Sequence, residues 1–394
     1  MDVLELDVTG IAHGGVGVAR DAGGRVVFVA DAIPRERVRA VVTEAKSSFA
    51  RATTTEVLEA STDRVVHVWP EASIDRAPDD RVGGAEFGHI RLERQRALKA
   101  QVLAESLERF AGIRRDVPVQ AVPGDEARDG LGWRSRVRLH VDAAGRPGPF
   151  AARSHRVIPV TTLPLADPAL GAVLGQEFPG VDTVDAIATE AGLRLVIGKQ
   201  APTVMEERVG DRGFRVDDTG FWQVHRGAPD VLVRAVRDAI DPATFDPAAA
   251  NADLYGGVGL LASVLVDLGG PSTRIETVES DARASAHAME NLADAEEVVA
   301  TTVRVDRWVR TAGPRPGATI VLDPPRSGAG IEVAAAIAGL GAARLVYVAC
   351  DPVALARDAK VLGVNGYRLE RLEAFDLFPH THHVEAVATF LPDA

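Results

Sequence analysis

The sequence contains a single cysteine, Cys350, among 394 residues. One cysteine cannot form a disulfide within the chain. No apolar run is long enough to cross a bilayer, because the most apolar stretch, 333–349, is interrupted by two glycines and an arginine. The opening letters MDVLELDVTG lack the basic start and the apolar stretch of a secretory signal. These absences predict a cytoplasmic protein that has no contact with a membrane.

Positive charge is also scarce. Lys and Arg number 44 against 56 Asp and Glu, which gives a formal net charge of -12. This balance argues against a protein that coats nucleic acid by charge alone, because phosphate contacts require clustered Lys and Arg. Residues 133–156 are a local exception, and in a strand Arg134, Arg136 and Arg138 would project from one face. That face is either an ordinary solvated surface or a phosphate-binding strip.

The length of the chain predicts two or three domains. Residues 1–59 consist of short β-rich runs separated by glycine pairs, a pattern typical of a small all-β barrel. This segment resembles the OB-like TRAM domain, a barrel often attached to RNA-modifying enzymes. Five cations could face a phosphate backbone there, or the module could serve only for packing: Arg35, Arg37, Arg39, Lys46 and Arg51.

The remainder of the chain divides into two further predicted parts. Residues 60–218 indicate a β-rich α+β central domain, with an irregular connection first and an amphipathic helix over 93–115. Residues 219–394 alternate apolar strands with Ala-rich helices, which predicts an α/β, Rossmann-like, doubly wound and mainly parallel sheet. Ligands of such a sheet bind at the carboxyl ends of its strands.

A glycine-rich turn opens the predicted α/β domain. In DLYGGVGLLA, Gly257, Gly259 and Ala262 fit the pattern G-x-G-x-x-A, in which a backbone turn lies close to a ligand at a helix N-terminus. Glu279 ends the next predicted strand, where a carboxylate could bind both hydroxyls of a ribose. Nicotinamide dinucleotides and S-adenosylmethionine both meet this pattern, so the turn alone leaves a dehydrogenase and a methyltransferase open.

The motif VLDPPRSGAG favours the methyl donor. Asp323 follows a predicted strand and precedes two prolines, which form a rigid bend that aims the acid into the crevice. Such an acid can bind the cationic methionine end of S-adenosylmethionine, whereas hydride transfer has no evident need of it. The alternative interpretation of Asp323 is a turn residue or a helix N-cap.

Cys350 ends the strand after Asp323, at the same ligand-bearing edge. A cysteine there is usually a small buried apolar residue, but the turn at Asp351 and Pro352 and a nearby helix N-terminus would favour a thiolate. A thiolate that adds to C6 of uracil makes C5 nucleophilic enough to accept a methyl group. Glu385, at the start of the last apolar strand, could then remove the C5 proton.

The tract FPHTHHVE contains three histidines before Glu385. Short His-rich tracts can bind zinc, but no second ligand pattern accompanies this one, so we expect no metal. We interpret His380, His382 and His383 as surface histidines that flank a strand.

Six motifs in order resemble the class I S-adenosylmethionine-dependent RNA uracil-C5 methyltransferases, which make 5-methyluridine. They are FWQVH, DLYGGVG, VESD, LDPPRSG, VYVACDP and FPHTHHVE, and with the TRAM-like start they cover nearly the whole chain. The resemblance implies Cys350 as the nucleophile and Glu385 as the general base. It implies S-adenosyl-L-methionine as cofactor, held by Gln223, Tyr255, Glu279, Asp306 and Asp323.

The chain departs from the family pattern at three places. Many members bind an iron–sulfur cluster through a C-G-G-C stretch, where this sequence has Val82 and Ala85, so we expect no cluster. Gly256 stands where a cysteine is common. Asp351 stands where many relatives have asparagine, and its charge could raise the pKa of the neighbouring thiol.

The resemblance implies a monomer that binds a structured RNA, either ribosomal or transfer RNA, and methylates a uridine exposed in a loop or flipped from its stack. Two alternatives stay open from the sequence: an S-adenosylmethionine-dependent enzyme that acts on another substrate, and a non-catalytic RNA-binding adaptor.

Overall fold

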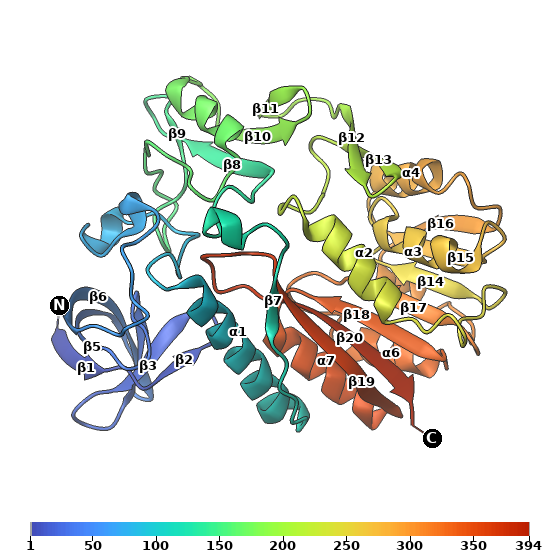
Figure 1. Ribbon diagram of the computed structural model, residues 1–394, viewed down its shortest axis with the longest axis horizontal. Coiled ribbons are helices and arrows are strands. Elements are labelled where there is room, and N and C mark those ends of the chain that lie inside the picture. The colour runs from blue at the N-terminus through green and yellow to red at the C-terminus, as the bar shows by residue number, and fades with distance from the viewer. Residues whose placement is uncertain (1, 394) are drawn as a thin grey trace.

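The computed structural model describes residues 2–393 and has three parts, which Figure 1 colours from blue through green to red. They are an N-terminal β-barrel, a central β-rich part and a C-terminal α/β part. No helix among the described residues is long and apolar enough to span a bilayer.

The N-terminal part is a six-stranded sheet with the order β1-β5-β6-β4-β3-β2, curled around its own apolar core. Alternate residues of β3, β4 and the first half of β5 are buried, as expected of strands with one face on a core. The strands are β1 (Val3–Asp7), β2 (Gly10–Ala12), β3 (Val16–Arg20), β4 (Val26–Ala30), β5 (Arg37–Ala45) and β6 (Phe49–Glu59).

Most of the basic residues of the barrel already have carboxylate partners. Arg37 and Arg39 pair with Glu5, and Lys46 and Arg51 pair with Glu44. Exposed pairs of this kind contribute little to stability, about 0–1 kcal/mol, so phosphates could displace the acids at small cost.

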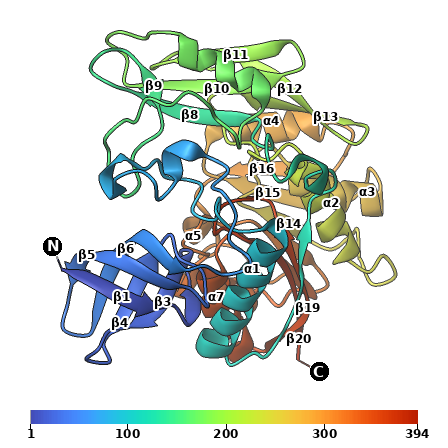
Figure 2. The same cartoon turned by 60° about the vertical axis from the view of Figure 1, so that its left-hand side comes forward.

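A long helix joins the barrel to the C-terminal part. After an irregular connection, α1 (Leu92–Ser106) continues as a π-helical turn (Leu107–Ala111) and ends at Gly112, which has a φ of 71°. Leu103 and Leu107 are fully buried in the core that also contains residues of α7 (Pro352–Val364). Figure 2 shows α1 between the barrel and the C-terminal sheet.

The central part has a four-stranded sheet with the order β11-β10-β8-β9. Its strands are β8 (Arg136–Val141), β9 (Pro147–Gly148), β10 (Thr183–Thr189) and β11 (Gly192–Ile197). Arg138 forms two hydrogen bonds to Asp185, and Arg136 donates to the Gly220 carbonyl and lies near Glu207. Two of the three arginines of the sequence's basic strip therefore serve contacts within the fold.

The C-terminal part is built on an eight-stranded sheet with the order β16-β15-β14-β17-β18-β20-β19-β7. The first five strands run parallel, while β20 runs antiparallel to both of its neighbours. The strands are β14 (Asn251–Leu254), β15 (Ile275–Glu279), β16 (Val298–Thr302), β17 (Thr319–Leu322), β18 (Arg344–Ala349), β19 (Tyr367–Asp376), β20 (Glu385–Pro392) and β7 (Val119–Ala121).

Helices cover both faces of this sheet. One apolar layer lies under α5, α6, α7 and α1, and the other lies under α2 and α3. All residues of β14, β17 and β18 are buried, as parallel strands covered on both faces require. The helices are α2 (Ala228–Asp238), α3 (Leu260–Gly269), α4 (Ala282–Asn291), α5 (Val305–Trp308) and α6 (Ile331–Gly339).

Two segments that precede residue 219 pack with the C-terminal sheet. β7 pairs in parallel with β19 at the sheet edge. The hairpin of β12 (Val204–Val209) and β13 (Arg212–Asp217) contributes Val209, Phe214 and Val216 to the core beneath α2 and α3. The sequence alone assigned both segments to the central domain, because neither has the strand–helix alternation of the part that they join.

A buried ion pair fixes α1 to the C-terminal sheet. Lys99 Nζ lies 2.5 Å from Asp376 Oδ1 and 3.0 Å from the Phe378 carbonyl oxygen, and both charged side chains are almost fully buried. Removal of one partner would leave an uncompensated buried charge.

We expect Lys99→Met to lower the free energy of unfolding by about 3–5 kcal/mol, because Asp376 would be left buried without its cation. Lys99→Met combined with Asp376→Leu removes both charges and should cost much less. Denaturant unfolding of both variants checks this, and equal losses in the two would contradict it.

Candidate active site

A cavity of about 640 Å³ lies at the carboxyl ends of the parallel strands. Six of the seven residues that the sequence predicted for the site line it: Gln223, Tyr255, Glu279, Asp323, Cys350 and Glu385. The seventh, Asp306, lines an adjoining hollow that shares Tyr255 and Glu279 with the main cavity. Asp306 is ion-paired with Arg304, which lowers the pKa of its carboxyl group.

Strand pairing brings Cys350 and Glu385 together. β18 and β20 are antiparallel neighbours in which Ala349 is opposite Ala386. Cys350 directly follows Ala349, and Glu385 directly precedes Ala386, so the thiol and the carboxyl group occupy adjacent strand ends at the same edge of the sheet. Both residues line the cavity, although 35 positions separate them in the sequence (385 − 350).

The loop after β17 carries Asp323 into the cavity. The backbone amides of Ala329 and Gly330 donate to Asp358 Oδ2 at 2.7 and 3.3 Å, and the Tyr347 hydroxyl donates to the same oxygen at 2.6 Å. Because Asp358 belongs to α7 and Tyr347 to β18, the loop is held by the strand and helix on either side of Cys350. The loop that carries Asp323 is therefore hydrogen-bonded to the two elements that flank Cys350.

The glycine-rich turn after β14 forms the other wall. A Cβ atom added at Gly256 would lie 2.2 Å from Thr277 Oγ1, so only glycine fits there. Gly257 adopts a left-handed φ of 52°, and its amide donates to Glu279 Oε2 at 3.1 Å.

Asp253 is a site residue that sequence reasoning missed. It is buried, it lines a small cavity beside the main one, and its Oδ1 atom has no hydrogen-bond partner. Burial raises its pKa to about 8. It is the first letter of the DLYGGVG motif, but only the tertiary structure distinguishes it from an acid exposed at a strand end.

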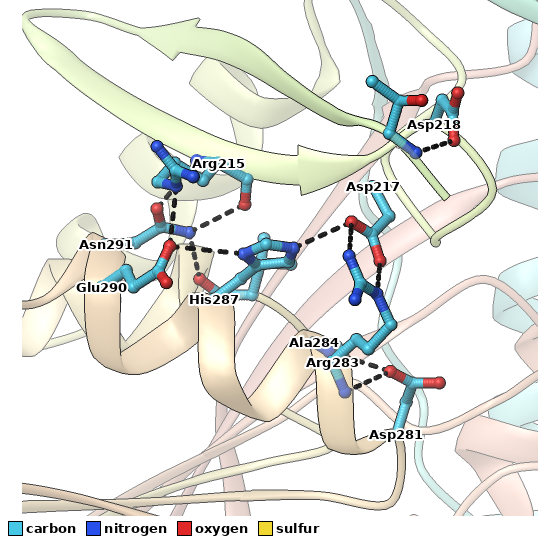
Figure 3. A network of polar contacts seen from close by, with 11 residues as sticks. Arg215, Asp217, Asp218, Asp281, Arg283, Ala284, His287, Glu290 and Asn291 are labelled. Atoms are coloured by element: carbon cyan, nitrogen blue, oxygen red, sulfur yellow. Dashed lines mark hydrogen bonds and ion pairs between the residues drawn. The ribbon is translucent and has the colours of Figure 1, made fainter. Parts of the chain in front are cut away.

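The hairpin β12–β13 is held against α4 by the polar network of Figure 3. Asp217 accepts hydrogen bonds from Arg283 and, at 3.0 Å, from His287 Nε2, and Arg283 holds the pKa of Asp217 at about 2. Asp281 caps α4 by accepting from the amides of Arg283 and Ala284. Asp217 and His287 line the main cavity, so this network shapes the wall next to Gln223.

Of the histidines of FPHTHHVE, His380 is buried and His382 and His383 are half-buried, which corrects the interpretation of all three as surface residues. His380 is 2% exposed, its amide donates to Gln95 Oε1 at 2.7 Å, and its ring lies 3.0 Å from Gln95 Nε2. His383 lines the main cavity, and burial lowers its pKa to about 3, so the imidazole is neutral. The sequence could not distinguish His380 from the other two, because its burial depends on contacts with Gln95 of α1.

No three or more His, Cys, Asp or Glu side chains in the range 2–393 are grouped as a metal site would require. Val82 and Ala85, at the places of cluster cysteines, are 4% and 2% exposed and pack in an apolar core with Trp69 and Ala151. These side chains offer no ligand atoms to iron, and the residues present do not fit a cluster.

Two acids that line the cavity dominate its electrostatics, the half-buried Asp323 and the buried Glu385. Burial raises the pKa of Asp323 to about 7, and burial together with the neighbouring Asp323 raises the pKa of Glu385. Burial also raises the pKa of the Cys350 thiol to about 12, and Glu385, Asp323 and Asp351 add to the shift. In the protein without ligands the net shift therefore opposes ionisation of the thiol, and the expected effect of Asp351 is present.

Comparison with known proteins gives two domain matches. The family described as tRNA (Uracil-5-)-methyltransferase matches residues 295–391, and the TRAM domain matches residues 2–55. An uncharacterized RNA methyltransferase of Streptomyces avermitilis is 39% identical, over 99% of this chain and 98% of that protein.

The chain belongs to the RNA uracil-C5 methyltransferase family. It is an enzyme of that class. A relative from Alkalilimnicola ehrlichii named 23S rRNA (uracil(1939)-C(5))-methyltransferase RlmD is 29% identical, over 99% of this chain and 97% of that one.

A solved structure has the same fold across the whole chain. The Pyrococcus abyssi tRNA (uracil-54, C5)-methyltransferase, in complex with S-adenosyl-L-homocysteine, has a TM-score of 0.72 and 18% sequence identity. The match covers 98% of this chain and 100% of that one.

The cavity fits the cationic methyl donor of the family. Glu279 and Asp323 line it, Asp253 and Asp323 line the small cavity beside it, and one oxygen of Asp253 is buried without a partner. Carboxylates buried without cations are costly, and a positively charged ligand would compensate them. The glycine turn provides a close backbone approach beside these acids.

The raised pKa of Cys350 can be tested on the protein without RNA or methyl donor. Because it is the only cysteine, its alkylation reports the ionisation of a single thiol. With a pKa of about 12, the thiol at pH 8 should react on the order of a thousandfold more slowly than free cysteine, and its rate should rise about tenfold per pH unit up to pH 11. Cys350→Ser should take no label, and a plateau near pH 9 would contradict the prediction.

Proposed function

We propose that the protein methylates C5 of a uridine in a structured ribosomal or transfer RNA through a covalent bond between Cys350 Sγ and C6, and that it acts as a monomer. One observation carries the proposal: Cys350 and Glu385 occupy paired ends of neighbouring strands and line one cavity with the acids of the donor site. S-adenosylmethionine would supply an electrophilic methyl group there.

Five residues would hold the donor. Asp323 would face its cationic end, and Glu279 would accept hydrogen bonds from the ribose hydroxyls. Gln223 and Tyr255 line the cavity between those acids and the hairpin wall, and Asp306 would approach the adenine from the adjoining hollow. A cation among these acids would also lower the pKa of Cys350, which couples donor binding to activation of the thiol.

The two catalytic residues would act in sequence. The Cys350 thiolate adds to C6 and moves electron density to C5 and O4 of the ring. C5 then takes the methyl group, and the donor leaves as the neutral thioether. Glu385 removes the C5 proton, the C5–C6 double bond forms again, and the bond between Sγ and C6 breaks. The thiolate is thereby regenerated, and Glu385 passes its proton to solvent.

The base must leave its stack before this chemistry can begin. Within a helix, C5 and C6 are covered by neighbouring bases, so Cys350 and the donor could not reach the ring together. The target is therefore a uridine in a loop or one flipped from the stack. The barrel and the central part are the surfaces that would bind the surrounding RNA.

We expect Cys350→Ala to abolish methyl transfer while donor affinity, measured by calorimetry, stays within about twofold of wild type. Tritium release from RNA labelled at C5 of uridine measures the reaction, because only substitution at C5 releases that label. An active Cys350→Ala variant would contradict the covalent route. Methyl transfer without tritium release would indicate another substrate atom.

We expect Glu385→Gln to reduce turnover by about 10²–10⁴-fold, because the C5 proton loses its acceptor. The methylated RNA should then stay attached to Cys350 and migrate with the protein on a denaturing gel. Glu370→Gln, at an exposed position of the neighbouring strand β19, is the matched control and should leave turnover unchanged. Mapping of 5-methyluridine in RNA from a strain without the gene identifies the RNA and its position.

A further inference from the structure

The barrel reaches the catalytic strand end through one short loop. His13, between β2 and β3, places Nε2 3.2 Å from Asp351 Oδ2, and the two side chains are 44% and 23% exposed. A Cβ atom at the nearby Gly15 would lie 2.6 Å from His382 Cβ, so the loop is packed tightly against the segment that leads to Glu385. The barrel thus contacts the residues that flank both catalytic groups.

Asp351 uses its two oxygens differently. Oδ1 caps α7 by accepting hydrogen bonds from the amides of Val353 and Ala354, at 3.0 and 2.8 Å. Oδ2 faces His13. Asparagine could also cap the helix, but it would bring no charge next to the thiol. Capping therefore does not require the negative charge of Asp351, and this charge raises the pKa of the neighbouring Cys350 thiol.

Charges of both signs face Cys350. Glu385, Asp323 and Asp351 oppose its ionisation, and Arg326 favours it. His13 faces Asp351, with the exposed Arg357 of α7 opposing its protonation and the ring of His382 6.4 Å away, centroid to centroid. His13 is the group that can offset the charge of Asp351.

We propose that His13 is a positioning residue: its protonated ring pairs with Asp351, offsets that charge beside the nucleophile, and so links the docked barrel to ionisation of Cys350. This rests on the proposed role of Cys350 as nucleophile. Nothing in the chemistry of the methyl donor requires a residue from the barrel, so the link gives the N-terminal part a role in activation besides RNA binding.

The ion pair of His13 with Asp351 determines how the reactivity of Cys350 should depend on pH. The hydrogen bond to Asp351 raises the pKa of His13 above its ordinary value. The offset is therefore fully present at low pH and is lost as the pH rises through the pKa of His13.

The test measures labelling of the only thiol with a maleimide from pH 5.5 to 9, on the full chain without RNA or donor. We expect His13→Gln to react about two- to fivefold more slowly than wild type at pH 5.5, and the difference to vanish by pH 9. In the Asp351→Asn background, His13→Gln should have no effect at any pH. His13→Lys should keep the wild-type low-pH rate and extend the offset to pH 9. His155→Gln, at an exposed site in the central part, is the matched control.

Equal rates for wild type and His13→Gln at every pH would overturn the proposal. So would a decrease that is independent of pH and persists with Asp351→Asn, because that pattern indicates loss of barrel packing. If His13→Gln does not fold, the Asp351→Asn variant is used instead. Its thiol must react faster than that of the wild type at pH 9, where His13 is neutral, and an equal rate would overturn the proposal. Labelling needs no methyl transfer, so failure here is distinguishable from failure of the proposed reaction.

Discussion

The antiparallel pairing of β18 with β20 is the contact on which the rest of the site depends. Five strands of the sheet are parallel, and their loops deliver Tyr255, Glu279 and Asp323 to one edge. Because β20 runs in the opposite direction, its first residue lies at that same edge, beside the residue that ends β18. A parallel strand in this place would have put its last residue there, and Glu385 would have been at the far end of the sheet.

Acidic side chains are concentrated at this edge of the sheet, where a cationic ligand would stabilise them. Asp253 and Glu385 are buried and Asp323 is half-buried, and the pKa values of these three carboxyl groups and of the thiol are all raised. An arrangement like this costs stability unless a cation occupies it. In the protein without ligands the pKa of the thiol is held at about 12, and under the proposed function a cation in the donor site would lower it.

Segments distant in sequence support the two catalytic positions. Gln95 and Lys99 of α1 hold the segment before Glu385, through His380 and Asp376 respectively. The barrel contacts the residue after Cys350 through His13. Both α1 and the barrel therefore contact the catalytic edge, even though the residues proposed to perform the chemistry lie in the last third of the chain.

The sequence by itself determined the local features. Apolar runs defined the buried strands, the glycine pattern defined the turn after β14, and the order of motifs identified the family, because each of these depends on residues adjacent in the chain. The tertiary structure decided the rest. It alone placed Asp306 in a separate hollow, buried His380 under α1, and brought β7 and the β12–β13 hairpin to the C-terminal core. It also revealed the isolated oxygen of Asp253 and the pairing of His13 with Asp351. These features depend on packing between distant segments, and burial and charge proximity have no periodicity in a sequence from which they could be predicted.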